Sequence, residues 1–550
     1  MTIRQWQLML AAGVAGLALS PGTGNAQDWA QIRTGAVNTV FFRVAVPVAS
    51  FREMRFLEAV DRIAPLRVPN IEASSTQKTG GGIAKPLAPG LSSKEINVVK
   101  GALRNRKIVA YSIPSIPSDE AAARELFEFA KALNVETIIS EPAAGALPLI
   151  DRLAAEFNIR VALVHPDPKA LRKMLDGRGD KIGAYADFAG AAALQDRLFA
   201  VRLTGARAAD WKDLFLALYR QKVRSAIYTF EPTASGEALT DLSAKLQAYE
   251  TALTPVMSEY VSELGRSAAI RTVDAQTRLT VEQKAEAKQK MDAAIPAHPQ
   301  AKPRKARKLL VIDLQVGYPG HPSIPYANYV LEQYGKRTGA WEATFSNDLA
   351  NFQYAKLRQY DAIFLNNTVG MLFADPEVRS SIVRFLQEGG GLAGYHASTH
   401  ASIDWPEFTE IIGASSGAHR EATERVTVKL DDPASAINAA FGGQAFESID
   451  EHFRWSNYSR QRVHVLLSID VPKTDLNQGR GCDICTRADG DYAISWIRGY
   501  GKGRVFYSSL GHAPTALMDN VLVRHFMAGV QFALGDLDAD TAPGNRPAGQ

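Results

Sequence analysis

Cysteine is almost absent from this chain of 550 residues, which holds only Cys482 and Cys485. A zinc site built on such a pair needs about four ligands, usually from two pairs, and the sequence has no second pair. A redox-active pair is expected to open a helix after a strand, whereas residues 478–481 and 487–490 on either side have the composition of loops. A disulfide closing a short loop is therefore the simplest interpretation, and it requires an oxidising compartment.

A large excess of charge is also missing, because the formal net charge is only +4. No cluster of Lys and Arg is interleaved with aromatic residues, so nucleic acid is not an expected partner. Residues 8–19 are apolar, but about a dozen residues are too few to span a bilayer core of roughly 30 Å. They follow Arg4 and precede the small residues 24–26, which predicts a signal peptide over residues 1–26. We therefore expect a periplasmic or secreted protein with no membrane span in its mature form.

The length exceeds what one hydrophobic core supports, so at least two domains are expected. Residues 39–262 alternate between short β-rich runs and segments with helical spacing. Eight such units predict an N-terminal (β/α)₈ TIM barrel. Its strands are predicted at residues 40–46, 66–72, 107–113, 136–140, 161–165, 182–186, 198–203 and 226–230. A loop over 74–93 should follow the second strand, and a helix and linker should occupy 263–307.

Residues 308–536 predict a second α/β domain, doubly wound and flavodoxin- or amidotransferase-like. Strands expected at 308–316, 341–346, 362–366 and 392–396 alternate with helices. Later strands follow without helices between them, which predicts a mixed edge of the sheet. Residues 537–550 are rich in Ala, Gly, Pro and Asp, which is typical of a disordered tail.

Polar residues follow the predicted strands of this second domain. Four of the ten histidines, His321, His396, His400 and His512, lie just after strand ends, and Asn366 closes the third strand. The carboxyl ends of strands in an open α/β sheet meet at one edge, so these residues should lie near one another. Histidine suits proton transfer near neutral pH, recognition of hydroxyls and metal ligation.

Three sequence blocks in this domain carry a resemblance. Residues 389–399 read Gly-Gly-Gly-Leu-Ala-Gly-Tyr-His-Ala-Ser-Thr, residues 450–454 read Asp-Glu-His-Phe-Arg, and residues 500–512 end in Ser-Ser-Leu-Gly-His. The domain thereby resembles the trehalose-utilization (ThuA-like) family over essentially its whole length. This resemblance implies a class I glutamine amidotransferase-like fold and a link to carbohydrate metabolism. Glutamine hydrolysis is not expected, because it needs a cysteine nucleophile where this chain has His396.

The first domain carries a second resemblance. Residues 89–93, 127–142 and 161–187 are similar to xylose isomerase-like sugar phosphate isomerase/epimerase barrels. The resemblance implies Glu141 and Asp187 as ligands of a divalent metal and His165 as a substrate contact. The chain departs from the family at Arg202, where a histidine ligand is usual, and a cation there would repel a metal ion. A degraded metal site is therefore expected, with ion pairing of the two carboxylates to Arg202 as the structural alternative.

Three hypotheses follow. The first is an exported enzyme that acts on a sugar or keto-sugar by bond cleavage, hydration or isomerisation, mainly in the ThuA-like domain. In that hypothesis His396, Glu451 and His512 perform acid–base chemistry. The substrate-binding residues are His321, Asn366, His400, Trp405, His419 and His165. The second hypothesis is a non-catalytic sugar-binding protein, and the third is a sugar isomerase or epimerase that uses a divalent metal in the barrel. A small carbohydrate is the expected partner in all three.

Overall fold

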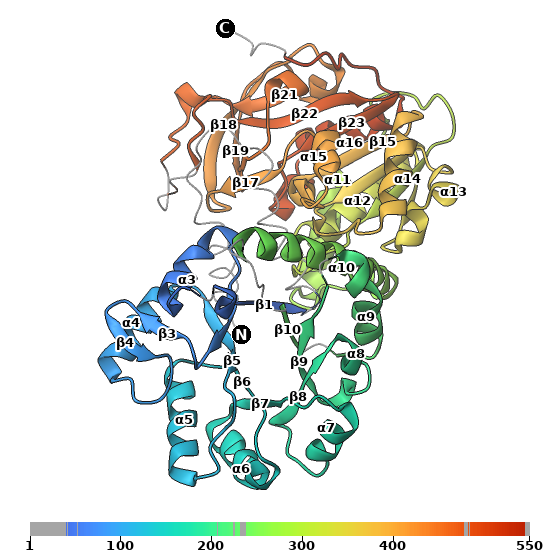
Figure 1. Ribbon diagram of the computed structural model, residues 1–550. Helices are drawn as coiled ribbons and strands as arrows, with labels where there is room; N and C mark the ends of the chain where they lie inside the picture. The colour runs from blue at the N-terminus through green and yellow to red at the C-terminus, as the bar shows by residue number, and fades with distance from the viewer. Residues whose placement is uncertain are drawn as a thin grey trace. The chain divides into compact units, whose positions relative to one another are not determined.

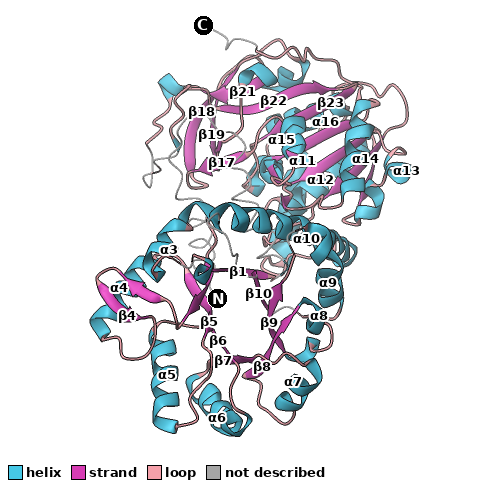
Figure 2. Cartoon of the chain, in the orientation of Figure 1, coloured by secondary structure: helices cyan, strands magenta, loops and turns pink. Residues whose placement is uncertain are grey.

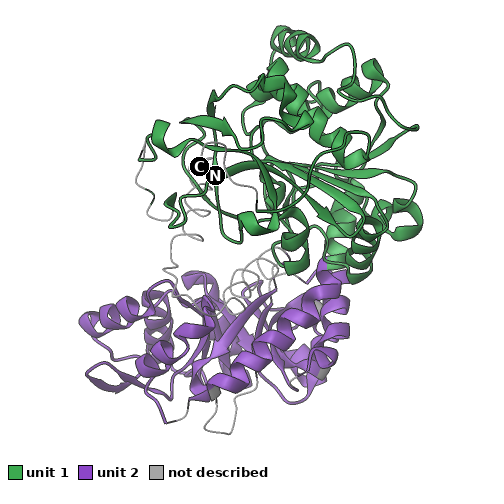
Figure 3. Ribbon diagram, turned by 90° about the horizontal axis from the view of Figure 1, so that it is seen from above, with its two compact units in different colours: residues 1–28, 258–550 green, residues 29–257 purple. Residues whose placement is uncertain are grey.

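The computed structural model describes residues 40, 42–51, 53–205, 207–223, 226–230, 238–477, 482 and 485–544. The chain divides into two compact units, one of residues 29–257 and one that contains residues 258–550 (Figure 3). The boundary falls within the long helix α10 (Ala238–Ser267). The predicted signal peptide, residues 1–26, lies outside the described residues.

The N-terminal unit is a closed barrel of eight parallel strands (Figure 1). Its strands are β1 (Arg43–Pro47), β2 (Asn70–Ser74), β5 (Lys107–Ser112), β6 (Thr137–Ser140), β7 (Arg160–Leu163), β8 (Ile182–Asp187), β9 (Leu198–Leu203) and β10 (Ile227–Phe230). Each overlaps one of the predicted strands, and the predicted TIM barrel is confirmed. Most of these strands are rich in apolar residues because a parallel sheet of this kind is buried on both faces, and β2, with Asn70, Glu72 and Ser74, is the most polar of them.

Helices surround the barrel, as the alternating pattern predicts (Figure 2). They are α3 (Phe56–Arg62), α4 (Ser93–Leu103), α5 (Glu120–Ala132), α6 (Leu147–Phe157), α7 (Pro168–Leu175), α8 (Phe188–Ala191), α9 (Ala208–Arg220) and α10. In α5, Ala123, Leu126, Phe127 and Ala130 are buried, and this spacing of three and four residues gives one apolar face. The loop expected over 74–93 contains a small hairpin instead, β3 (Lys78–Gly80) and β4 (Ile83–Pro86). Its turn has two glycines with positive φ, which residues without a Cβ adopt at little cost.

The C-terminal unit is built on a nine-stranded sheet of order β12-β11-β13-β15-β23-β22-β21-β18-β19. The parallel part comprises β11 (Lys308–Ile312), β12 (Glu342–Phe345), β13 (Ala362–Asn366), β15 (Gly391–Tyr395) and β23 (Gly503–Ser508). The antiparallel part comprises β18 (Glu424–Leu430), β19 (Phe446–Asp450), β21 (His464–Ile469) and β22 (Ala493–Tyr500). The predicted doubly wound domain with a mixed edge is thus confirmed.

Both faces of the parallel part are covered. Leu309 and Val311 of β11 belong to the main core with residues of α12 (Ile324–Thr338) and α16 (Asn520–Leu534). Leu310 and Ile312 are equally buried, and alternation along a strand points them to the opposite face. The helices α14 (Pro376–Gln387) and α15 (Pro406–Ile412) also contact β23. This packing holds the strand ends in fixed positions, which the site described below requires.

The segments that precede and follow this sheet in the sequence form specific contacts, which a free linker or tail would not. Arg307, in the basic run before β11, is 9% exposed and forms ion pairs with Asp361 and Asp536. In the predicted tail, the carbonyl of Ala542 contacts Nδ1 of His464 at 2.9 Å, while residues 545–550 lie outside the described residues. Helix α11 (Val281–Ala294) occupies part of the predicted helix and linker segment.

Cys482 and Cys485 form a disulfide, as the loop composition indicated. Within the described ranges, no helix combines the length and apolarity needed to cross a bilayer.

Acid should destabilise the C-terminal unit through His525 of α16, which is fully buried and contacts Ser495 Oγ at 3.1 Å. Burial lowers the pKa of His525 to about 4. In the unfolded chain the pKa of a histidine is about 6.5, so between pH 4 and pH 6.5 the unfolded state binds more protons than the folded state. The stabilisation is complete above pH 6.5 and falls by about 3 kcal/mol as the pH drops towards 4.

Urea unfolding of wild type and His525→Gln at several pH values between 7 and 4 measures this contribution. The free energy of unfolding of the variant should change less over this range. Identical pH dependence in the two proteins would show that His525 does not titrate in this way.

Candidate active site

Three histidines meet because of the strand order. His321 follows β11, His396 follows β15 and His512 follows β23. These strands run parallel in the order β11-β13-β15-β23, so their carboxyl ends lie along one edge of the sheet. Residues far apart in sequence are thereby brought together, as the sequence pattern predicted.

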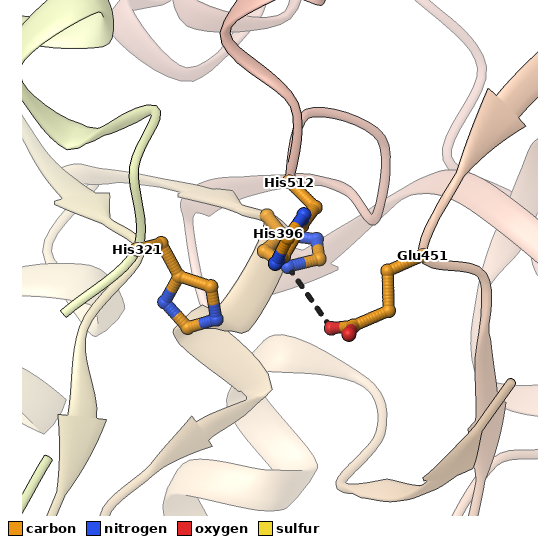
Figure 4. A group of neighbouring side chains, drawn as sticks. All are labelled: His321, His396, Glu451 and His512. Atoms are coloured by element: carbon orange, nitrogen blue, oxygen red, sulfur yellow. Dashed lines mark ion pairs between the residues drawn. The ribbon is translucent and has the colours of Figure 1, made fainter. Parts of the chain in front are cut away.

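Glu451 joins them from the short connection between β19 and β20 (Phe453–Trp455). One potential ligand atom from each of the four residues lies within 4.8 Å of the others. We call His321, His396, Glu451 and His512 the site cluster. Figure 4 shows the Glu451 carboxylate directed towards His396, whose Nε2 lies 3.5 Å from Glu451 Oε2. The three imidazole centroids are 4.9 to 5.6 Å apart.

The position of His396 is strongly constrained. Its φ is +46°, in the left-handed region that residues with a side chain rarely adopt. Its Nδ1 lies 2.8 Å from the carbonyl oxygen of Ser509, so Nδ1 carries the proton that is donated there. Phe453 stacks on the ring at a centroid distance of 4.9 Å. Such strained, over-determined positions are concentrated at functional sites.

The two closest members of the site cluster favour opposite charges. Burial opposes ionisation of Glu451, but the contact with His396 and the nearby His419 outweigh it and lower the pKa of Glu451 to about 2. Burial likewise opposes protonation of His396, yet the interaction with Glu451 outweighs it and raises the pKa of His396. The carboxylate is therefore ionised at neutral pH although it is largely enclosed.

The remaining histidines favour the neutral form. Burial, reinforced by the neighbouring imidazoles, lowers the pKa of His321 to about 2. Burial also lowers the pKa of His512, against the attraction of Glu451. For His400, burial and then His419 lower the pKa to about 4. Neutral imidazoles offer ring nitrogens with free lone pairs, which can accept a proton or bind a metal ion.

His419 lies at the solvent-accessible side of Glu451. It ends β17 (Ser416–His419), which pairs with β20. Its Nδ1 is 3.1 Å from Glu451 Oε1, and its side chain is 44% exposed. Glu451 thus lies between an exposed imidazole on one oxygen and the buried His396 on the other.

Three other predicted site residues are held by their neighbours. The Asn366 amide donates to the carbonyl of Ile324 and to Asn328 Oδ1, so it fixes the start of α12. Trp405 is 5% exposed and stacks on Phe408. His400 lies closer to the site cluster, because its ring and that of His396 both contact Phe453. Direct binding of substrate by these three residues remains a prediction.

The predicted barrel residues have different surroundings. Asp187 accepts a hydrogen bond from the Gly190 amide and caps α8. Glu141 is exposed, and His165 Nδ1 accepts from the amide of Asp167. Arg202 donates to Tyr185 Oη at 2.9 Å. Metal binding by Glu141 and Asp187 therefore stays a prediction. Arg202, whose positive charge is expected to oppose such binding, lies in β9.

Asp450 is a positioning residue that we did not predict, although it stands in the Asp-Glu-His-Phe-Arg block. Its buried carboxylate accepts hydrogen bonds from the amides of Glu451, Gly511 and Ala513. It therefore joins the segment that carries Glu451 to the loop that carries His512. The sequence cannot distinguish the roles of these two neighbouring carboxylates. The structure shows that Glu451 faces His396, whereas Asp450 binds backbone amides.

Gly511 should not tolerate a side chain. Its φ is +108°, and an added Cβ would lie 1.9 Å from Tyr395 Oη, which donates a hydrogen bond to the Gly511 carbonyl. Gly511→Ala is expected to displace the neighbouring His512 and reduce any activity of the site at least about tenfold, since small misplacements of catalytic groups are costly. Kinetics of Gly511→Ala beside Gly442→Ala, at an open position with φ +60°, test this. Equal activities of the two variants would contradict it.

Comparison with known proteins identifies a family for the C-terminal sheet domain. Residues 308–533 match the family model described as trehalose utilisation, ThuA. Residues 308–533 are a ThuA-like domain. The site cluster lies entirely within it, and the expected family resemblance of the second domain is confirmed. No curated protein matches the chain.

Solved structures similar to this chain include ThuA-like proteins and xylose isomerase-like TIM barrel proteins. A putative ThuA-like protein from Bacteroides uniformis is 22% identical, covers 43% of this chain and 93% of its own, and has a TM-score of 0.35. A xylose isomerase-like TIM barrel protein from Mycobacterium smegmatis, in complex with magnesium, is 11% identical and covers 38% and 98%, with a TM-score of 0.30. A D-allulose 3-epimerase from Methylomonas sp., in complex with D-allulose, is 14% identical and covers 40% and 96%, with a TM-score of 0.28.

Proposed function

We propose that the ThuA-like domain is a carbohydrate-processing enzyme that acts on a sugar or keto-sugar at the site cluster. The observation that carries the proposal is the convergence of three imidazoles and one carboxylate at the strand ends, with ligand atoms within 4.8 Å. The family description, trehalose utilisation, supports a sugar as the substrate class.

The arrangement suits reactions at a hydroxyl or a carbonyl. Cleavage, hydration and isomerisation of a keto-sugar each require one group that removes a proton and one that supplies it. His396 and Glu451 provide a pair 3.5 Å apart, and His512 adds a ring 5.3 Å from that of His396. His419 connects the pair to solvent through Glu451 Oε1. Proton transfer is thereby available on both sides of the carboxylate.

A panel of glucosides and their 3-keto derivatives, incubated with wild type and Glu451→Gln, tests the proposal. Product analysis should show conversion of at least one compound by wild type and a loss of about 10²-fold or more in the variant. Glu447→Gln, at an exposed carboxylate of β19, is the matched control and should keep full activity. Conversion by Glu451→Gln at the wild-type rate would place the reaction elsewhere in the chain.

The same panel separates the alternatives. Thermal stabilisation by a sugar without any product would favour a non-catalytic sugar-binding protein. Product formation that is lost in Glu141→Gln and retained in Glu451→Gln would favour an isomerase or epimerase in the barrel. Arg202, which lies at β9 among the barrel strands, is the observation that makes this last outcome less expected.

We also propose that the protein is exported to the periplasm or secreted. The apolar residues 8–19 and the small residues before position 27 support this proposal. N-terminal sequencing of the mature protein should find cleavage after Ala26. A mature chain that begins at Met1 would contradict it.

A further inference from the structure

We infer that the site cluster binds one divalent first-row transition metal ion through three imidazole nitrogens and one carboxylate oxygen. The bound ion would act as an electrophile in the proposed reaction, so the inference rests on the proposed function and on the same four residues. Metal binding can nevertheless be measured without any sugar, so the two can fail separately.

Unsatisfied ring nitrogens are the first argument. His396 is fully buried, and its Nε2 lies 3.5 Å from Glu451 Oε2 without forming a hydrogen bond to any residue that the structure describes. Nδ1 of His321, which is 8% exposed, also lacks one within the described ranges. A buried polar atom without a hydrogen bond is destabilising, because it has lost its contacts with water and gained nothing in exchange. Two of them in one group of four residues indicate that something outside the protein chain binds there.

The tautomer of His396 is the second argument. Because its Nδ1 donates a proton to the Ser509 carbonyl, the second ring nitrogen, Nε2, is the one that faces Glu451. A metal ion bound there would take the place of the Nε2 proton that Glu451 otherwise favours. A histidine that ligates a metal usually donates its other ring N–H to a carbonyl or carboxylate in this way. Glu451 is similarly supported, because His419 contacts Oε1 and leaves Oε2 facing His396.

The distances are the third argument. Two ligands about 2.1 Å from an ion in a tetrahedral arrangement are about 3.4 Å apart. The separation between His396 Nε2 and Glu451 Oε2 is 3.5 Å, and all four ligand atoms lie within 4.8 Å of one another. Small rotations of the side chains therefore bring all four within bonding distance of one ion.

The ligand types determine the class of ion. Imidazole suits zinc, iron, nickel and copper, whereas magnesium and calcium prefer oxygen ligands. Three nitrogens and one oxygen thus favour a transition metal over the ions typical of carboxylate sites. With an ion bound, the imidazoles of the cluster are ligands, and His419 is the exposed imidazole left to carry protons.

Metal analysis of the full chain tests the inference. Untagged protein is dialysed against Zn²⁺, then against buffer, and its zinc is measured by mass spectrometry. Wild type should retain about one ion per chain, and Co²⁺ in its place should give visible absorption typical of nitrogen ligands. His512→Gln and Glu451→Gln should weaken binding at least about 100-fold, because loss of an outer-shell partner already costs 10–100-fold.

His298→Gln is the matched control, since His298 is an exposed histidine outside the site cluster. It should bind zinc as wild type does. Circular dichroism confirms that each variant is folded, and the wild-type Co²⁺ spectrum reports the ligands without any substitution. The inference would be overturned if wild type retained no ion or if both folded site variants bound zinc fully. It would also be overturned if Glu141→Gln lost the ion instead. Zinc bound without turnover of any sugar would contradict only the proposed function.

Discussion

Replacement of His396 by asparagine is expected to reduce kcat/KM for the responsive sugar by about 10²–10⁴-fold, the usual contribution of a positioned acid–base group. His396 contacts all three other members of the site cluster. Its Nε2 faces Glu451, and its ring contacts those of His321 and His512. Its loss removes a proton carrier or a metal ligand, and both roles lead to the same expected decrease.

Asparagine is preferable to alanine at this position because of the backbone. The φ of +46° strains most residues, whereas asparagine tolerates the left-handed region. The variant therefore tests the imidazole with little effect on the fold. Steady-state kinetics beside His298→Gln, with unfolding curves of both, measure the effect. Equal kcat/KM in wild type and a folded His396→Asn would remove His396 from the mechanism.

Replacement of Arg454 by methionine is expected to lower the free energy of unfolding by about 3 kcal/mol or more. Arg454 donates to Glu424 Oε1 at 2.5 Å, and their side chains are 2% and 0% exposed. Methionine fills similar space but leaves the Glu424 carboxylate buried with less compensation. Burial opposes ionisation of Glu424, while His452 and Arg454 outweigh it and keep its pKa below the ordinary value.

Urea unfolding of wild type and three variants measures this effect. Arg425→Met is the matched control, because Arg425 pairs with Glu447 on the same part of the sheet but is about half exposed. It should change the free energy of unfolding by no more than about 0.5 kcal/mol. The double variant Arg454→Met/Glu424→Gln should recover part of the loss. Equal stability of Arg454→Met and Arg425→Met would show that the buried pair contributes no more than an exposed one.

This charge pair is close in sequence to the segment that carries Glu451. Arg454 belongs to β20, two residues after His452 and three after Glu451, and also donates to the His452 carbonyl at 2.9 Å. The pair therefore stabilises the strand that presents Glu451 to the histidines. A loss of stability in Arg454→Met is expected to reduce activity as well, but through the position of Glu451 rather than through contact with a substrate.

From the sequence alone, the two folds and the gathering of histidines at the strand ends could be predicted. Alternation of apolar strands and amphipathic helices specifies a parallel sheet closely enough that all eight barrel strands and the mixed C-terminal sheet were expected. The histidines after strand ends were also identifiable, because parallel strands carry their carboxyl ends to one edge. His321, His396 and His512 meet there for that reason.

The folded structure was needed to show which polar residues lie in or next to the site cluster and which stabilise the surrounding elements. Asn366 and Trp405 follow or flank the same strands as the histidines, yet their contacts are to α12 and to neighbouring aromatic rings. Glu451 and His419 come from added strands outside the parallel sheet, where local sequence periodicity carries no information about distance to β15. Side-chain direction and tautomer depend on contacts between residues distant in sequence, such as that between His396 and the Ser509 carbonyl, and these exist only once the chain is folded.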